Sequence, residues 1–355
     1  MKKLYSCLTY FDLSRLLGLK TQELRDILKS NPVLKSLQPS KSLSFDSAKL
    51  ILSAFNLKYK FKCISFINLK GGVGKTTTAA TLATKSLQYA YKSCLIDLDP
   101  QGSSTTIFCD KSEADLTIFY DLWSEPEKYL PKSLINVESE LFLLPSSLEN
   151  SLLDATLTNP RYQKNALSEV CNVLKNNQFE LILVDCPPSL GAAVISTICA
   201  SDIIVIPVNN DPLSLRGLNF TMTEINSICD IFKLKTPQIK ILYTKYDKRE
   251  KMTFETQKIL EKNFQDYLIP HYIKTSTAYS NSFNNNRTIY GSHAVNKSKK
   301  DYDFFSDEDS AWTNDDNSVI YAMKKGIKLL VTGFSKRGTK TVDTYTLNGF
   351  TAAYN

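Results

Sequence analysis

The stretch "NLKGGVGKTTTAATLA", residues 68–83, decides the fold, because it reads as a glycine-rich loop between a strand and a helix. A mostly apolar run precedes it, and a helix-forming run rich in alanine and threonine completes it. In this strand–loop–helix context, glycines followed by Gly-Lys-Thr predict a phosphate-binding loop. Leu69 stands where the usual pattern has its first glycine, and an extra lysine, Lys70, follows it.

The residue types of this loop suit the phosphates of a nucleotide. Glycines let backbone N–H groups turn toward phosphate oxygens, and the helix N-terminus adds the positive end of its dipole. The second lysine would reach the terminal phosphates, and the hydroxyl after it would ligate Mg²⁺. The predicted nucleotide-binding residues of the loop are Gly71, Gly72, Val73, Gly74, Lys75, Thr76 and Thr77.

Apolar, β-rich runs recur beyond the loop and alternate with amphipathic stretches. Strands that are apolar throughout suit a sheet covered on both faces, and strand–helix alternation favours an α/β domain with a doubly wound, mostly parallel sheet. We therefore predict a P-loop NTPase domain over residues 61–305, with its site at the carboxyl ends of the strands. The predicted strands are 63–69, 93–99, 141–145, 181–187, 202–208 and 239–245, and the helices between them include 75–90, 161–177, 214–232 and 253–266.

Aspartates end two of these strands. The segment "LIDLDPQGSS" supplies Asp97 and Asp99, and "LILVDCPPS" supplies Asp185. A carboxylate at the end of a buried strand is costly without a partner, and Mg²⁺ beside the phosphate loop would be one. We predict that Thr76, Asp97 and Asp185 hold the metal and that Asp99 orients or deprotonates the attacking water. Aspartates that only cap loops are the alternative.

Together, "KGGVGKTTT", "DLDPQGS" and "DCPPS" resemble the deviant Walker A ATPases of the ParA/MinD superfamily, closest to ParA partition proteins. The resemblance covers about residues 61–305. It implies ATP and Mg²⁺ as cofactors, a homodimer that closes around two nucleotides, nonspecific DNA binding, and ATP hydrolysis stimulated by a ParB-like partner. Lys70 matches the signature lysine that reaches the partner's phosphates, so the implied catalytic residues are Lys70, Lys75 and Asp99.

The resemblance also places contacts outside the loop. Residues 244–249 resemble the segment that cradles the adenine, and residues 208–218 resemble the segment before the dimer-face helix. Two departures are "STAYS" where the family has E-A-P-S, and Cys186 where threonine is common. The implied adenine contacts are Tyr246, Asp247 and Arg249, and the implied DNA contacts are Lys274, Arg287, Lys299 and Lys300.

Residues 1–60 read as a separate, small helical module. They hold 11 Lys and Arg against 4 Asp and Glu, which equals the net charge of +7 of the whole chain, so an anionic partner is expected for this part. Residues 10–29 have the spacing of a helix-turn-helix, as in winged-helix modules, with Thr21 placed to cap the second helix. A helical hairpin that packs on the ATPase domain is the alternative. The predicted packing residues are Leu13, Leu17, Leu19, Leu24 and Ile27, and the predicted DNA contacts are Gln22, Arg25 and Lys29.

Composition argues against several kinds of site and location for this protein. The eight cysteines form no C-x-x-C pair and there are only two histidines, which disfavours a zinc site and histidine-based catalysis. No apolar run reaches the length of a membrane span, and the N-terminus lacks a signal peptide, so we expect a cytoplasmic protein without a membrane partner. The family resemblance further implies that it is associated with the nucleoid. Residues 306–355 are a tail in which 328–353 alternate like a β-hairpin.

Three other functions stay open at this point. A MinD-like regulator of a membrane or division site would need a basic amphipathic C-terminal helix, which the sequence does not show. A metabolic ATPase, related to dethiobiotin synthetase or the nitrogenase iron protein, fits "DLDPQGS" and the N-terminal module less well. A repressor that uses ATP as a co-ligand is compatible with partition, since the N-terminal module could repress the chain's own operon.

Overall fold

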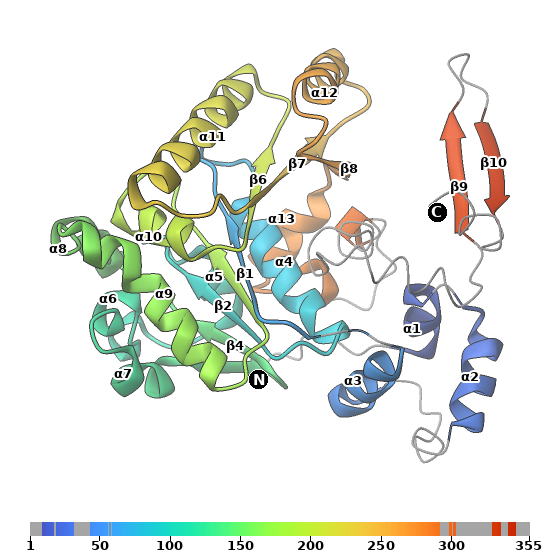
Figure 1. Cartoon of the computed structure of the whole chain (residues 1–355), viewed down its shortest axis with the longest axis horizontal. Helices are drawn as coiled ribbons and strands as arrows, with labels where there is room; N and C mark the ends of the chain where they lie inside the picture. Colours follow the sequence, from blue (N-terminus) through green and yellow to red (C-terminus); the bar gives the residue numbers. More distant parts are fainter. Residues whose placement is uncertain are drawn as a thin grey trace.

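The fold is built on one sheet of eight strands with helices on both faces (Figure 1). The computed structural model describes residues 9–17, 19–31, 43–55, 57, 59–291, 298–299, 301–302, 329–334 and 340–345. The strand order is β3-β4-β2-β5-β1-β6-β7-β8. The strands are β1 (Lys62–Phe66), β2 (Ser93–Asp97), β3 (Ile135–Glu138), β4 (Leu141–Leu144), β5 (Leu181–Asp185), β6 (Ile203–Val208), β7 (Gln238–Tyr246) and β8 (Leu268–Lys274).

Neighbouring strands of this sheet are parallel, except for the antiparallel pair β3–β4. The central strand β1 lies between β5 and β6, and β2 lies on the other side of β5. In register, Asp185 at the end of β5 faces Phe66 of β1 on one side and Asp97 of β2 on the other. The predicted doubly wound, mostly parallel sheet is confirmed. Its carboxyl edge places Asp185 next to the strand that enters the loop, and Asp97 one strand further on.

Two apolar layers cover the sheet. One contains α9, α10, α11 and part of α12, and the other contains α4 with residues 289–290 and Tyr302. Alternate residues of β1 serve the two layers, since Cys63 packs in the first and Ile64 in the second. Both faces of the central strands are therefore buried, which is why these strands are apolar throughout. The helices of this domain are α4 (Lys75–Gln88), α5 (Ser103–Phe108), α6 (Phe119–Leu122), α7 (Pro126–Ser133), α8 (Leu153–Thr156), α9 (Pro160–Asn176), α10 (Ala192–Ala200), α11 (Pro212–Phe232), α12 (Lys251–Asn263) and α13 (Thr277–Asn284).

Short 3₁₀ turns complete the domain. They are η1 (Glu113–Asp115), η2 (Leu148–Leu152) and η3 (Ile289–Gly291). Within the described part of the chain, no helix has both the length and the apolar character that crossing a bilayer requires.

Three N-terminal helices, α1 (Tyr10–Leu16), α2 (Thr21–Ser30) and α3 (Phe45–Ala54), share an apolar cluster of their own. Leu13 and Leu24 are fully buried in it, and Ala90 joins it from the loop after α4. Lys49 of α3 also forms a 2.6 Å ion pair with Glu180, which directly precedes β5. The helical module is thus attached to the body of the protein near the end of the sheet opposite the phosphate loop.

Two details of the expected helix-turn-helix packing are wrong. Thr21 does not cap α2, because the cap residue is Lys20, whose backbone N–H donates to Glu23 Oε2 at 2.9 Å. The Thr21 hydroxyl instead meets Ser14 Oγ at 3.1 Å, where the two helices approach each other. Ile27 is 39% exposed, and Leu28 takes the buried position.

In the tail, β9 (Leu329–Phe334) and β10 (Lys340–Tyr345) pair antiparallel. The expected turn between them and the remaining residues of 306–355 lie outside the described residues.

Candidate functional site

Hydrogen bonds fix both ends of the loop after β1. Asn68 accepts the Lys70 N–H at 2.9 Å through Oδ1 and donates to the Pro207 carbonyl at 2.7 Å. Thr244, near the end of β7, donates to the carbonyl of Val73 at 2.7 Å. Gly72 has φ 72° and Gly74 has φ 97°, which a side chain would strain. A Cβ placed on Gly71 or Gly72 would meet no atom within 4 Å, so the loop borders open space.

Lys75 begins α4 and is only 6% exposed. Its ammonium donates to the Lys70 carbonyl at 3.1 Å. Burial lowers the pKa of Lys75, and the nearby Asp185 and Asp99 carboxylates offset part of that change. Lys75 is therefore placed where a helix N-terminus already favours an anion.

Asp185 is fully buried at the end of β5. Its Oδ2 accepts a 2.7 Å hydrogen bond from Ser104, while its Oδ1 has no hydrogen-bond partner among the described residues. Burial raises the pKa of Asp185 to about 6, while the hydrogen bond from Ser104, the nearby Thr76 hydroxyl and the charge of Lys75 act in the opposite direction. An unpartnered, buried carboxylate oxygen beside a hydroxyl is a donor set that fits a hard cation such as Mg²⁺.

Asp97 is also fully buried, but both of its oxygens are occupied. Oδ2 accepts from the backbone N–H and the hydroxyl of Thr105, each at 2.8 Å, and Oδ1 accepts from Asp99 N–H at 3.2 Å. Burial and the neighbouring Asp185 raise the pKa of Asp97 well above its usual value. In this geometry Asp97 fixes the turn that carries Asp99, and Asp185 offers the open oxygen.

Asp99 lies at the rim of the site. Its Oδ1 accepts the Gln101 N–H at 3.0 Å, and its backbone carbonyl accepts a 2.7 Å hydrogen bond from Ser146. Asp99 itself is half-buried.

Lys70 has a partner within its own chain. Its Nζ lies 2.6 Å from Asp211 Oδ2, and Asp211 caps α11 by accepting the Leu213 N–H at 2.8 Å. The contact with Lys70 lowers the pKa of Asp211, and the Leu213 N–H adds to the effect. A lysine that reaches a second protomer must first leave this ion pair.

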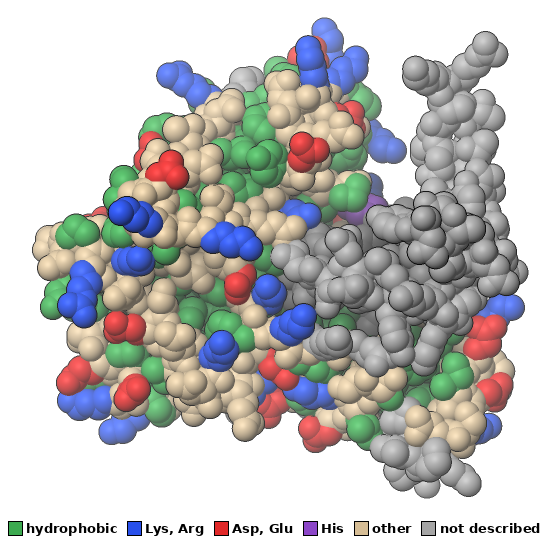
Figure 2. All heavy atoms as spheres, viewed as in Figure 1, with side chains coloured by type: hydrophobic (Ala, Val, Ile, Leu, Met, Phe, Trp, Pro, Cys, Tyr) green, Lys and Arg blue, Asp and Glu red, His purple; other side chains and the backbone are tan. Residues whose placement is uncertain are grey.

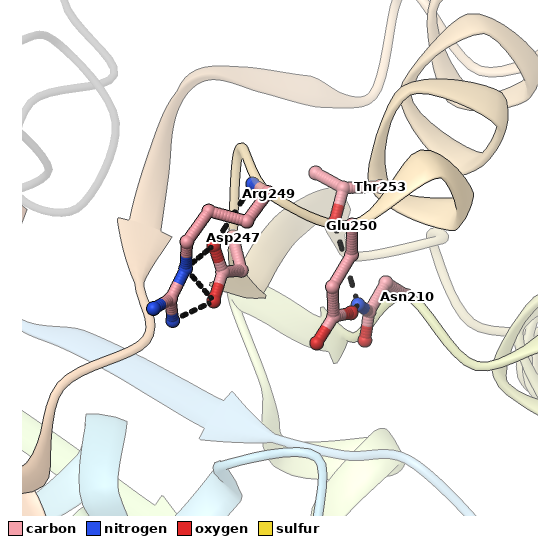
Figure 3. A network of polar contacts seen from close by, with 5 residues as sticks. All are labelled: Asn210, Asp247, Arg249, Glu250 and Thr253. Carbon is pink, nitrogen blue, oxygen red and sulfur yellow. Dashed lines mark hydrogen bonds and ion pairs between the residues drawn. The ribbon is translucent and has the colours of Figure 1, made fainter.

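The segment expected to hold the adenine is shown in Figure 3. Arg249 pairs with both carboxylate oxygens of Asp247, at 2.9 Å from Nε to Oδ1 and 2.5 Å from Nη2 to Oδ2, although its side chain is 86% exposed. This pair lowers the pKa of Asp247 to about 2. Beside it, Asn210 donates to Glu250 and, at 3.3 Å, to the Thr253 hydroxyl, which ties the start of α11 to that of α12 (Figure 3).

Tyr246, one of the expected adenine contacts, has its side chain in the core. Lys245 has φ 53° and interrupts the pairing of β7 with β8, so that Tyr246 points to the same side as Tyr243. Tyr246 is 7% exposed, stacks on Tyr272 with ring centroids 4.8 Å apart, and donates to Gln257 at 3.2 Å. The ring therefore belongs to the core beneath α12.

The residues expected to contact DNA lie on two separate surfaces. Gln22, Arg25 and Lys29 are exposed and follow one another along α2. Lys274 is exposed at the end of β8 and forms a 2.6 Å ion pair with Asp301. Arg287 and Lys299 are half-buried, and Lys300 lies outside the described residues.

Sequence reasoning missed the residues that support the loop and the aspartates. Asn68 and Thr244 lie near the ends of predicted strands, and Ser146 directly follows one. Ser104 ends the segment "LIDLDPQGSS", so position was the available signal for all four. Their roles become visible only when the carboxyl edges of β1, β2, β4 and β7 are brought together.

Comparison with known proteins agrees with this site. A family model described as an AAA domain matches residues 61–241, more than half of the chain. The chain therefore belongs to this AAA domain family.

The chain is similar to curated proteins and to a solved structure. MJECL24 of Methanocaldococcus jannaschii is 32% identical over 212 residues, which cover 58% of this chain and 80% of that protein. The chromosome-partitioning ATPase Soj of Treponema pallidum is 29% identical over 223 residues, covering 62% and 87%. A structure described as a plasmid partition protein from Borrelia burgdorferi B31, bound to AMPPNP, is 25% identical with a TM-score of 0.56, covering 70% of this chain and 98% of that one.

Proposed function

We propose that this chain binds ATP with Mg²⁺ at the loop of residues 69–76 and hydrolyses it. The observation that carries the proposal is the buried Oδ1 of Asp185, an acceptor with no partner among the described residues, beside the Thr76 hydroxyl and the Lys75 ammonium. Binding a cation there would offset the cost of burying that oxygen. The AMPPNP in the similar Borrelia structure supports an adenine nucleotide as the ligand.

Each residue of the site then has a task. Backbone N–H groups of Gly71 to Gly74 and the Lys75 ammonium bind the phosphates, and Thr77 adds a contact near the α-phosphate. Thr76 and Asp185 hold Mg²⁺, with Asp97 supporting them through the turn after β2. The ion, when bound, neutralises charge on the phosphate oxygens. Asp99 orients the attacking water and accepts its proton, and Asp247 and Arg249 border the adenine.

The proposal includes an ATP-dependent homodimer. Leu213, Phe220 and Ile231 along α11 are 64%, 53% and 72% exposed. Figure 2 shows apolar side chains gathered over α11 and α12 on the visible face. Exposed apolar patches of this kind favour a protein interface. In the dimer, Lys70 leaves Asp211 and reaches the phosphates bound by the second copy.

For DNA partition, the closed dimer binds DNA nonspecifically through Lys274, Arg287, Lys299 and Lys300. A ParB-like partner stimulates hydrolysis and releases the dimer. Gln22, Arg25 and Lys29 of α2 contact the operator of the chain's own operon, so that residues 1–60 act in autorepression. We expect such a protein to be cytoplasmic and associated with the nucleoid.

Replacement of the loop lysine tests the nucleotide site. Lys75→Ala removes the buried ammonium and should weaken ATP·Mg²⁺ binding by about 100-fold or more, measured by titration calorimetry. Lys258→Ala is the matched control, because Lys258 is an exposed lysine of α12 away from the loop. Wild-type affinity in Lys75→Ala would contradict the assignment.

A further inference from the structure

Tyr302, far along the chain, contacts the helix that follows the phosphate loop. Tyr302 is 2% exposed and lies against α4, where its hydroxyl is 3.1 Å from Thr78 Oγ1. Thr78 is fully buried, and its hydroxyl donates to the Gly74 carbonyl at 2.7 Å. Because the Thr78 hydrogen is used on Gly74, the tyrosine hydroxyl is the donor between Tyr302 and Thr78.

We propose that Tyr302 is a positioning residue for the phosphate loop. The Gly74 carbonyl and the Lys75 N–H belong to one planar peptide unit, so fixing the carbonyl also fixes the direction of that N–H. Gly74 has a positive φ of 97°. Its carbonyl accepts hydrogen bonds from both the backbone N–H and the hydroxyl of Thr78, and these two bonds hold the residue in that conformation. Tyr302 keeps the Thr78 hydroxyl turned toward Gly74 and thereby holds the Lys75 N–H in its phosphate-facing direction.

Tyr302 can do this because its own segment is anchored to other elements. Asp301, next to it, is 5% exposed and accepts the backbone N–H of Lys274 at 3.0 Å and its ammonium at 2.6 Å. Tyr279 of α13 packs edge-on against the Tyr302 ring, with centroids 5.9 Å apart, and donates to the Ser298 carbonyl at 3.3 Å. Contacts to β8 and α13 therefore fix the tyrosine before it meets α4.

This inference rests on the proposed nucleotide site, and its test separates the two. Tyr302→Phe keeps the ring and its packing but loses the hydroxyl, so ATP·Mg²⁺ affinity should fall about two- to tenfold. Tyr279→Phe is the matched control, because it removes a tyrosine hydroxyl from the same cluster that donates to the Ser298 carbonyl. That control should keep wild-type affinity while showing a comparable change in melting temperature.

A double-mutant cycle tests the route through Thr78. Thr78→Val removes the hydroxyl that Tyr302 acts on, so adding Tyr302→Phe to Thr78→Val should leave the affinity unchanged. Equal affinities of Tyr302→Phe and Tyr279→Phe, or additive losses in the cycle, would overturn the inference while leaving the nucleotide site standing. A wild-type protein that binds no ATP·Mg²⁺ would overturn both.

Discussion

The carboxyl edge of the sheet and the three N-terminal helices carry their charged side chains in opposite ways. At the edge, Asp97, Asp185 and Lys75 are almost completely buried. On α2, Arg25 and Lys29 are exposed to solvent. Buried charges are costly and persist only with partners, whereas an exposed basic face costs little. Burial of charge therefore marks the carboxyl edge of the sheet as a binding site. The function of the exposed basic face of α2 has to be tested by a binding experiment.

The largest expected effect is on ATP hydrolysis, and it separates catalysis from nucleotide binding at the carboxyl edge of the sheet. Asp99→Ala should keep ATP affinity within about threefold, because Asp99 lies at the rim, but lower hydrolysis by about 100-fold or more. Phosphate release and nucleotide titration measure the two quantities, and the variant should stay on DNA as a dimer. Loss of ATP binding would instead make Asp99 a structural residue of the turn.

The pH dependence of the edge gives the next largest effect. The pKa of Asp185 is raised to about 6, so the carboxylate is charged and able to bind a metal only above that pH. Affinity for ATP·Mg²⁺ should fall by up to about tenfold per pH unit below 6, and the ligand-free protein should lose stability as pH rises through 6.

Comparing wild type with Asp185→Asn isolates the contribution of this carboxylate. The phosphates of ATP also titrate, but they do so equally in experiments with either protein. Calorimetry from pH 5 to 8 should show a flatter profile for the variant in binding and in thermal stability. Parallel profiles for the two proteins would show that Asp185 is not the titrating ligand.

Smaller effects on DNA binding should distinguish the basic surface of α2 from the surface that carries Lys274. Arg25→Ala with Lys29→Ala should weaken binding to DNA from upstream of the chain's own gene by about tenfold and spare ATP-dependent binding to random DNA. Lys274→Ala should do the reverse, with a smaller salt dependence of binding, because a phosphate contact is lost. Filter binding at two salt concentrations measures both. Equal losses on both DNAs from the α2 variant would mean that α2 reads no sequence.

Much of the sheet could be predicted because its strands are buried on both faces. The predicted strands at 93–99, 181–187 and 202–208 agree with β2, β5 and β6 within two residues. Strands β3 and β8 at the sheet edges were not predicted as strands, since they are only partly buried and carry a mixed pattern. Helix α10 was missed because "AAVISTICA" is buried along most of its length and shows no amphipathic period.

The candidate site was predictable where a motif carries it and unpredictable where tertiary contacts do. The loop lysines and Asp185 follow from short motifs, and the structure brings them to one edge of the sheet. Ser104 and Thr244 act through residues far away in the sequence, which no local pattern reveals. The buried position of the Tyr246 side chain could not be predicted either, because the positive φ of Lys245 reverses the side-chain alternation of β7.

The central claim is a dimer in which Lys70 exchanges its partner Asp211 for the nucleotide of a second copy. Mass measurement in solution with ATP and Mg²⁺ tests it most directly, with Lys70→Ala beside the wild-type protein and a nucleotide titration on both. Wild-type protein should shift from monomer to dimer, and Lys70→Ala should bind ATP within about threefold of wild type yet remain a monomer. A Lys70→Ala variant that dimerises like wild type would contradict the account.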